Sequence, residues 1–261
     1  PSGVWLRTGL SESKSAMLEV RNLSKRYGET VALDGASISF AAGSVHTIMG
    51  ENGSGKSTLV KLLSGVVSAD QGEILVNGEA FSGRDPIAFQ AKGFATVFQE
   101  VLVAPDRNVI DNILLGYDGP FVRRLARSAR RDAVTEVLSR CARTVIDLDV
   151  DAGSLPLATQ QLVVLARALV RKPRILILDE VTAALDFNDR EIVFSLIESL
   201  ARDGCLVLFI SHRMDEVLRL SDRITILRSG KVVETLDRAD ISPERLLEKM
   251  APEILQERRH G

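Results

Sequence analysis

The chain has 261 residues, enough for one large domain or for one domain with an inserted subdomain. Its 33 Lys and Arg residues against 35 Asp and Glu residues leave a formal net charge of −2, which excludes the basic character of a dedicated nucleic-acid-binding protein. The hydrophobic share of 45% and the charged share of 26% are typical of a globular protein and exclude extensive disorder. Charged residues or glycines interrupt every apolar run well before the ~18–20 residues that span a bilayer, so we expect no membrane helix.

Strand and helix patterns alternate along the chain, which predicts a parallel sheet with crossover helices. The first half contains strand-like stretches at residues 18–23, 36–40, 45–49, 73–76 and 94–98. A glycine-rich turn follows the third of them and leads into a predicted helix over residues 55–63. The pattern is helical over residues 108–168, and strands are predicted again at residues 175–178, 206–210 and 224–227, with helices between them. We therefore expect an α/β core interrupted by a helical insertion.

The glycine-rich turn carries the strongest motif. Residues 50–57 fit the pattern G-x-x-x-x-G-K-[ST] of a phosphate-binding loop that opens a helix. Glycines allow the positive φ angles and close backbone approach that phosphates need, and the helix N-terminus adds partial positive charge. Lys56 is expected to reach the β- and γ-phosphates, and the Ser57 hydroxyl to bind Mg²⁺. The predicted nucleotide contacts in this segment are Gly50, Asn52, Gly53, Gly55, Lys56, Ser57 and Thr58.

A second motif is the apolar stretch 175–178 followed by Asp179 and Glu180. A strand that ends in a carboxylate delivers Asp179 to the carboxyl edge of the sheet, where open α/β sheets bind ligands. Asp179 can hold Mg²⁺ there, directly or through water. Glu180 follows at once and is placed to polarise an attacking water as a general base. The alternative is an acidic strand cap without chemistry, and the phosphate-binding motif upstream argues against it.

In this order the two motifs resemble those of the nucleotide-binding subunits of ATP-binding cassette (ABC) transporters, and the resemblance runs from about residue 17 to residue 250. Tyr27 matches the aromatic residue that stacks on adenine in this family, and residues 184–186 match the loop that crosses the dimer interface. Gln99 matches the glutamine that touches Mg²⁺ or the attacking water, and His212 matches the switch histidine at the γ-phosphate. Each match is weak alone, and their shared order makes the resemblance specific.

The resemblance implies an α/β fold, a P-loop NTPase cassette with a parallel-sheet core, an antiparallel β flank and an inserted helical subdomain. It implies ATP and Mg²⁺ as cofactors and ATP hydrolysis as the reaction. The implied catalytic residues are Glu180, His212 and Gln99, and the implied Mg²⁺ ligands are Ser57, Gln99 and Asp179. We expect residues 1–16 to be a flexible extension or a tag remnant, the cassette to cover residues 17–261, and the helical subdomain to cover about 100–160.

The segments around Gln99 and His212 are most similar to importers of simple sugars such as ribose, galactose and xylose, and to the first of their two tandem cassettes. This implies a subunit that energises sugar import through membrane permease subunits, peripheral to the cytoplasmic face of the cell membrane. It also implies a second cassette as partner and, indirectly, a solute-binding protein. Because a cassette does not touch the solute, the sugar rests on similarity alone. A cassette acting on ribosomes or DNA is disfavoured by the net charge, so no nucleic-acid partner is expected.

One departure from the family pattern concerns the signature Leu-Ser-Gly-Gly-Gln, which falls on residues 155–159. Pro156 replaces the serine whose hydroxyl binds the γ-phosphate of the opposing subunit, and proline also lacks an N–H. Ala158 replaces the second glycine and adds a methyl group where backbone meets phosphate. The following helix is predicted over residues 159–170. We therefore expect a partner cassette with an intact signature. The alternative function is a catalytically impaired, regulatory half of an asymmetric dimer.

The remaining candidates have structural interpretations. Cys141 and Cys205 lack metal-ligand spacing and are expected to be small core residues. His46 lies on an apolar strand and is expected to be a satisfied core histidine, while His260 belongs to a charged tail. Five arginines are expected on a solvated helix face, with contact to anionic lipid headgroups as the alternative: Arg123, Arg124, Arg127, Arg130 and Arg131.

Overall fold

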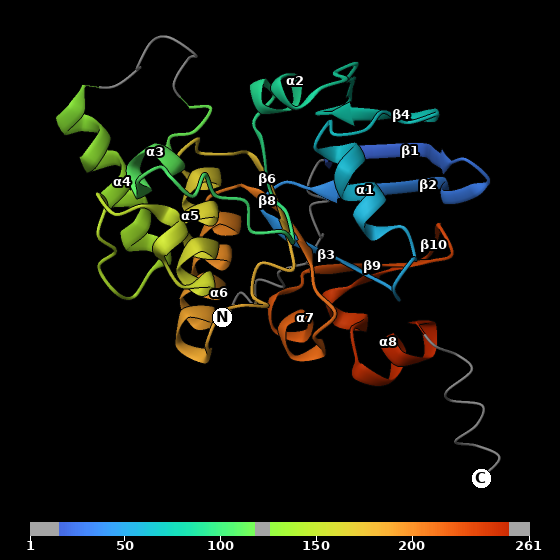
Figure 1. Ribbon diagram of the computed structural model, residues 1–261. Coiled ribbons are helices and arrows are strands. Elements are labelled where there is room, and N and C mark those ends of the chain that lie inside the picture. Colours follow the sequence, from blue (N-terminus) through green and yellow to red (C-terminus); the bar gives the residue numbers. More distant parts are fainter. Residues whose placement is uncertain (1–15, 118–125, 251–261) are drawn as a thin grey trace, which may run out of the picture.

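Two sheets form the centre of the molecule in the computed structural model, which describes residues 16–117 and 126–250 (Figure 1). The larger sheet has the strand order β10-β9-β3-β8-β7-β6, and its neighbouring strands are parallel except for β9 and β10. Its strands are β3 (Ser44–Met49), β6 (Phe94–Val97), β7 (Ile175–Asp179), β8 (Leu206–Ile210), β9 (Arg223–Arg228) and β10 (Lys231–Asp237). The smaller sheet is antiparallel, in the order β2-β1-β4-β5, with β1 (Ala16–Tyr27), β2 (Thr30–Ala41), β4 (Gln71–Val76) and β5 (Glu79–Ala80).

Helices surround the larger sheet. They are α1 (Lys56–Leu63), α2 (Pro86–Ala91), α3 (Val109–Ile113), α4 (Arg127–Cys141), α5 (Leu157–Leu169), α6 (Phe187–Arg202), α7 (Met214–Leu220) and α8 (Pro243–Met250), with 3₁₀ turns at Ala152–Ser154 and Arg238–Asp240. Helices α3, α4 and α5 gather on the left of Figure 1, and the antiparallel sheet lies on the right. Among the described helices, none combines the length and the apolar character needed to cross a bilayer.

The parallel strands are buried on both faces, and alternate residues point into two different clusters. In β7, Leu176 and Leu178 pack with the cluster that includes α5 and α6, whereas Ile175 and Ile177 pack with the antiparallel sheet and α1. Strand β8 follows the same alternation. The central sheet thus packs against helices on one face and against the antiparallel sheet and α1 on the other. This packing fixes the positions of the carboxyl ends of its strands.

The α/β fold class predicted from the sequence is confirmed, and each predicted strand is present with shifts of a few residues at its ends. Helix α5 begins at Leu157, two residues earlier than predicted. The helical interpretation of residues 108–168 is wrong for residues 142–156, where the described structure has only one 3₁₀ turn. Asp147, Asp149 and Asp151 lie in this stretch, and aspartate side chains compete with a helix for backbone hydrogen bonds.

Two structural interpretations need correction. Arg130 does not lie on a solvated face: it is 5% exposed and its guanidinium pairs with Asp111 at 2.8 Å, which ties α4 to α3. His46 is buried as expected, but only one of its ring nitrogens is satisfied. Its Nε2 lies 2.8 Å from Thr225 Oγ1, while Nδ1 is buried without a hydrogen-bond partner among the described residues.

The expectations for Arg131 and for the two cysteines are confirmed. Arg131 does lie at the surface, paired with Asp149, and Cys141 and Cys205 are buried free thiols as expected. Burial raises their thiol pKa values to about 12 and about 11. Of the expected extension at residues 1–16, Ala16 already belongs to β1, and the other fifteen residues lie outside the described ones. Arg123, Arg124 and His260 also lie outside the described residues, as does the Arg127 side chain.

Candidate functional site

The phosphate-binding loop joins the carboxyl end of β3 to the start of α1. Its glycines are required by the backbone: Gly55 has a φ of +106°, and a Cβ there would lie 2.6 Å from the Ala32 carbonyl oxygen. A Cβ at Gly50 would lie 2.2 Å from the Leu227 carbonyl oxygen. Because Gly55 is also the N-cap of α1 and has no side chain to cap it, the first amide groups of the helix keep their capacity to bind an anion.

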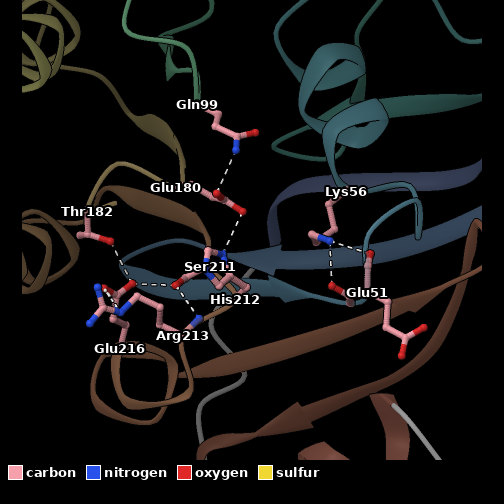
Figure 2. A network of polar contacts seen from close by, with 10 residues as sticks. Glu51, Lys56, Gln99, Glu180, Thr182, Ser211, His212, Arg213 and Glu216 are labelled. Carbon is pink, nitrogen blue, oxygen red and sulfur yellow. Dashed lines mark hydrogen bonds and ion pairs between the residues drawn. The ribbon is translucent and has the colours of Figure 1, made fainter. Parts of the chain in front are cut away.

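The Lys56 side chain lies across this loop (Figure 2). Its Nζ donates to the carbonyl oxygen of Gly50 at 2.7 Å and to that of Glu51 at 2.8 Å. Partial burial lowers the pKa of Lys56, and the carboxylates of Glu180, Asp179 and Glu51 partly offset this shift. An ammonium group in this position is a ready partner for a phosphate, since a charged ligand would replace two neutral carbonyl acceptors.

The other predicted contacts of the loop lie beside Lys56. Asn52, Gly53 and Ser57 are exposed, and Thr58 is half-buried in the first turn of α1. Tyr27 ends β1 and is 45% exposed, with Lys25 Nζ 5.7 Å from its ring centroid. It pairs with Thr30 across the β1–β2 turn, close in sequence to the Ala32 carbonyl that contacts the loop at Gly55. The antiparallel hairpin therefore borders the phosphate-binding loop.

Gln99, Glu180 and His212 meet at the carboxyl edge of the large sheet (Figure 2). They follow β6, β7 and β8, which are neighbouring parallel strands. Gln99 Nε2 donates to Glu180 Oε2 at 3.0 Å, and His212 Nδ1 lies 3.1 Å from Glu180 Oε1. The structure thus brings together the three side chains that the sequence analysis singles out as catalytic, and it holds the Glu180 carboxylate between the other two.

Asp179 lies directly before Glu180 and is 7% exposed. Its pKa is raised to about 6, first by burial and then by the neighbouring Glu180 carboxylate, against the opposing effect of Lys56 and Lys61. Two adjacent carboxylates in a place of low solvation favour a cation, and Asp179 with the exposed Ser57 hydroxyl supplies oxygen donors of the kind that Mg²⁺ prefers. The residues present therefore fit the predicted metal, and Gln99, the third predicted ligand, contacts Glu180 at 3.0 Å.

The structure also reveals a polar cluster that the sequence analysis does not identify. Glu216 in α7 is fully buried, and its carboxylate joins the loop after β7 to the loop after β8 through Thr182 and Ser211 (Figure 2). The sequence offers one signal for it: an acidic residue on the face of a helix that otherwise points into the core.

The start of α5 carries the residues that are expected to stand in place of the family signature. Pro156 is the N-cap and makes no side-chain capping bond. Leu157 is 58% exposed, so an apolar side chain stands at the helix start. Gln160 Nε2 donates to the Leu155 carbonyl oxygen at 2.8 Å, which closes the turn before the helix. Residues 184–186 end at Asp186, whose side chain caps α6 by accepting from the Asp189 amide.

Comparisons with known proteins agree with this geometry. A family model described as ABC transporter matches residues 33–183. The chain is similar to the ribose import ATP-binding protein RbsA 1 of Rhizobium etli, with 38% identity over 90% of this chain and 46% of that protein. The namesake protein of Burkholderia ambifaria is 41% identical over 92% of this chain and 47% of its own length. The chain therefore spans about half the length of the curated relatives it matches.

A solved structure, the dimeric bacterial ABC transporter cassette MJ0796, has 26% identity and a TM-score of 0.77 and covers 85% of this chain and 99% of its own. The likeness extends to both sheets and to the helices around them, since it covers most of the chain. With a family model that matches more than half of the chain and relatives close to 40% identical over nine-tenths of it, the chain belongs to the ABC transporter family.

Proposed function

We propose that this chain binds Mg-ATP and hydrolyses it as the energising subunit of an importer of simple sugars. The observation that carries the proposal is the Glu180 carboxylate, held within 3.1 Å of both Gln99 and His212 at the sheet edge that also bears the phosphate-binding loop. A carboxylate fixed in this way is a general base with a defined position for an attacking water. The family supports ATP hydrolysis as the reaction class.

Each residue of the site takes one role in this proposal. The loop amides and Lys56 bind the β- and γ-phosphates, and Tyr27 stacks on the base. Glu180 accepts a proton from the attacking water, while Gln99 and His212 hold the carboxylate and contact the water and the γ-phosphate. Asp179, Ser57 and Gln99 would hold Mg²⁺, which supplies charge neutralisation for the phosphates when bound.

Sugar import is supported by the relatives, which are named ribose import ATP-binding proteins. The chain would work at the cytoplasmic face of the membrane with permease subunits, and indirectly with a solute-binding protein. A cavity of about 290 Å³ next to the Gln99 segment supports docking of a permease segment. Its lining includes Phe89, Phe98 and the exposed Leu102 and Leu115. Phe98 lines this cavity and is followed directly by Gln99, so a permease segment bound in the cavity would contact the residue next to Gln99.

A second candidate is a regulatory half of an asymmetric dimer, and it rests on the start of α5. Pro156 and Ala158 occupy positions where the family places a phosphate-binding serine and a glycine. Under this alternative the chain binds nucleotide in a regulatory role, and catalytic turnover lies mainly elsewhere in the dimer. The relatives favour the hydrolysing subunit over the regulatory one. We also assign residues of about 100–160 to a helical subdomain, based on α3, α4 and the start of α5.

The test is to measure steady-state ATP hydrolysis by the chain alone and with a partner cassette that carries an intact signature, and to ask whether permease subunits co-purify with it. We expect low turnover alone, higher turnover with the partner, and capture of permease subunits. Failure to bind Mg-ATP would refute the proposal as a whole. Capture of ribosomes or DNA in place of a permease would refute the transport role and leave the ATPase.

A further inference from the structure

Glu216 is the most deeply buried acidic side chain near the site. It lies in α7, is 0% exposed, and is not one of the groups proposed to touch nucleotide or metal. Burial of a carboxylate is costly unless hydrogen bonds and opposite charges compensate it. The hydrogen bonds and ion pairs of the Glu216 carboxylate therefore indicate its role.

One oxygen of Glu216 accepts hydrogen bonds from two different loops. Thr182 Oγ1 donates to Oε2 at 2.9 Å, and Ser211 Oγ donates to the same atom at 2.6 Å. Ser211 Oγ in turn accepts from the Arg213 amide at 3.1 Å. The carboxylate therefore joins the segment after β7 to the segment after β8 and fixes the turn on both sides of His212 (Figure 2).

The other oxygen of Glu216 faces two guanidinium groups. Arg213 Nε lies 3.4 Å from Oε1, and Arg190 Nη1 of helix α6 lies 3.9 Å from it. Oε1 has no hydrogen bond within the described residues, so these charges act on it at longer range. Asp186, the N-cap of helix α6, ends the segment that follows Glu180, and the cluster therefore gathers three elements around one carboxylate.

The two joined segments carry the groups proposed to do the chemistry. Thr182 follows Glu180 by two residues, and Ser211 precedes His212 by one. Glu180 has a φ of +51°, in the left-handed region that is strained for a non-glycine residue and persists only where the surrounding structure holds it. The hydrogen bond from Thr182 to Glu216 holds the backbone in this way two residues after Glu180.

We propose that Glu216 is a positioning residue for ATP hydrolysis, which rests on the proposed function. By holding Thr182 and Ser211 on one oxygen, it sets the separation of the two loops and so the contact between Glu180 and His212. We call the two hydrogen bonds from Thr182 and Ser211 to Glu216 Oε2 the clip. Because a catalytic group displaced by about 1 Å can lose roughly 10²-fold in rate, the loss of this clip affects turnover far more than nucleotide affinity.

The experiment compares Glu216→Ala and Glu216→Gln with Asp215→Ala, which removes a neighbouring exposed acid and its 3.8 Å ion pair with Arg213 but keeps both hydroxyl contacts to Glu216. The glutamine retains an oxygen that can accept from both hydroxyls, so it should partly rescue the alanine variant. Hydrogen exchange on the nucleotide-free chain reports the clip directly. We expect about tenfold faster exchange at residues 181–183 and 211–213 in Glu216→Ala, and no change in α1.

Turnover and affinity form the second measurement. In the assembly with the highest turnover, Glu216→Ala should lower kcat by roughly 10–100-fold, while the Mg-ATP dissociation constant by calorimetry stays within about twofold. Should Glu216→Ala fail to fold, Thr182→Val removes one of the two hydroxyl donors at nearly constant volume and should reproduce a smaller part of both effects.

Three outcomes would overturn the proposal. Unchanged exchange at residues 211–213 would mean that no clip exists, whatever the activity. Faster exchange throughout the central sheet would mean that Glu216 only stabilises the fold. Local loosening with unchanged kcat would mean that the clip does not serve hydrolysis. A chain that never hydrolyses ATP would refute the proposed function, and the exchange result would still decide whether the clip exists.

Discussion

The carboxyl edge of the large sheet and the start of α5 are the two regions that the proposed function assigns to nucleotide contact. In this chain the two regions differ in the contacts that their side chains make. At the sheet edge, Glu180 contacts Gln99 and His212, and Lys56 contacts the loop carbonyls. At the start of α5, Pro156 makes no side-chain capping bond and Leu157 is exposed.

The difference separates residues proposed to act on nucleotide bound to the same chain from residues proposed to act on a partner's nucleotide. In the proposed function the sheet edge serves nucleotide bound to the same chain, and packing on both faces of the sheet holds its residues. The start of α5 would serve nucleotide bound to a partner, so changes there leave the fold and the chain's own site intact. Three experiments, in order of decreasing effect, test this contrast, and a fourth tests the strand that leads into the phosphate-binding loop.

Replacing Glu180 by glutamine should have the largest effect. The amide is close in shape but cannot take a proton from water, so hydrolysis should fall by roughly 10²–10⁴-fold while Mg-ATP binding is kept. The measurement is single-turnover hydrolysis beside calorimetric titration, with Glu79→Gln on the exposed β5 as the matched control. A Glu180→Gln chain with most of its activity left would transfer the role of positioning water to Gln99 or His212.

Repairing the start of α5 should raise hydrolysis by the chain alone. A single preorganised donor at a developing charge is worth about 10²–10³ in rate, and Pro156→Ser restores a hydroxyl while Leu157→Gly, Ala158→Gly and Thr159→Gln complete the family pattern. Steady-state ATPase assays on the unmodified and repaired chains check this, with the unmodified chain plus its partner cassette as reference. Robust hydrolysis by the unmodified chain alone would remove the contrast between the two regions.

Replacing Lys56 by alanine should weaken Mg-ATP binding about tenfold or more, because a charge-assisted contact to phosphate is worth roughly 1.5–3 kcal/mol. Lys61→Ala removes the same charge from the last turn of α1 and should change affinity by less than about twofold. Calorimetric titration with ATP separates the two variants. Equal affinities in all three proteins would show that Lys56 only shapes the empty loop.

The smallest effect concerns the strand below the loop. Burial, with the charge of Arg223, lowers the pKa of His46 from 6.5 to about 3. The unfolded chain therefore takes up a proton below about pH 6.5 that the folded chain refuses. The contribution to stability is complete above that pH and is lost as pH falls toward 3. Between pH 7 and pH 5.5 we expect a loss of about 1 kcal/mol in the free energy of unfolding.

Urea unfolding at several pH values measures this slope, and His46→Gln serves as the comparison because it removes the titrating group from the same buried position. The difference in slope between the two proteins isolates His46 from the carboxylates, which titrate in both. Identical slopes would mean that His46 is protonated in the folded state, in conflict with its burial in β3.

The structural features that depend on local spacing can be predicted from the sequence. Residues 50–57 predicted a loop and a helix because the positions of glycine, lysine and serine are fixed by the geometry of phosphate binding, and the apolar runs predicted the central strands. Asp179 and Glu180 were placed at the sheet edge by the same reasoning, since a strand has a definite end. These inferences needed no knowledge of which strands are neighbours.

The tertiary structure alone decided what depends on contacts between distant residues. That Gln99, Glu180 and His212 meet follows from β6, β7 and β8 being neighbours, and the separations of 81 and 32 residues leave no periodic trace of this. The burial of Arg130 and of Glu216 could not be read from the chain, because a charged residue in an amphipathic pattern is expected to face water until a partner such as Asp111 or Ser211 is brought beside it.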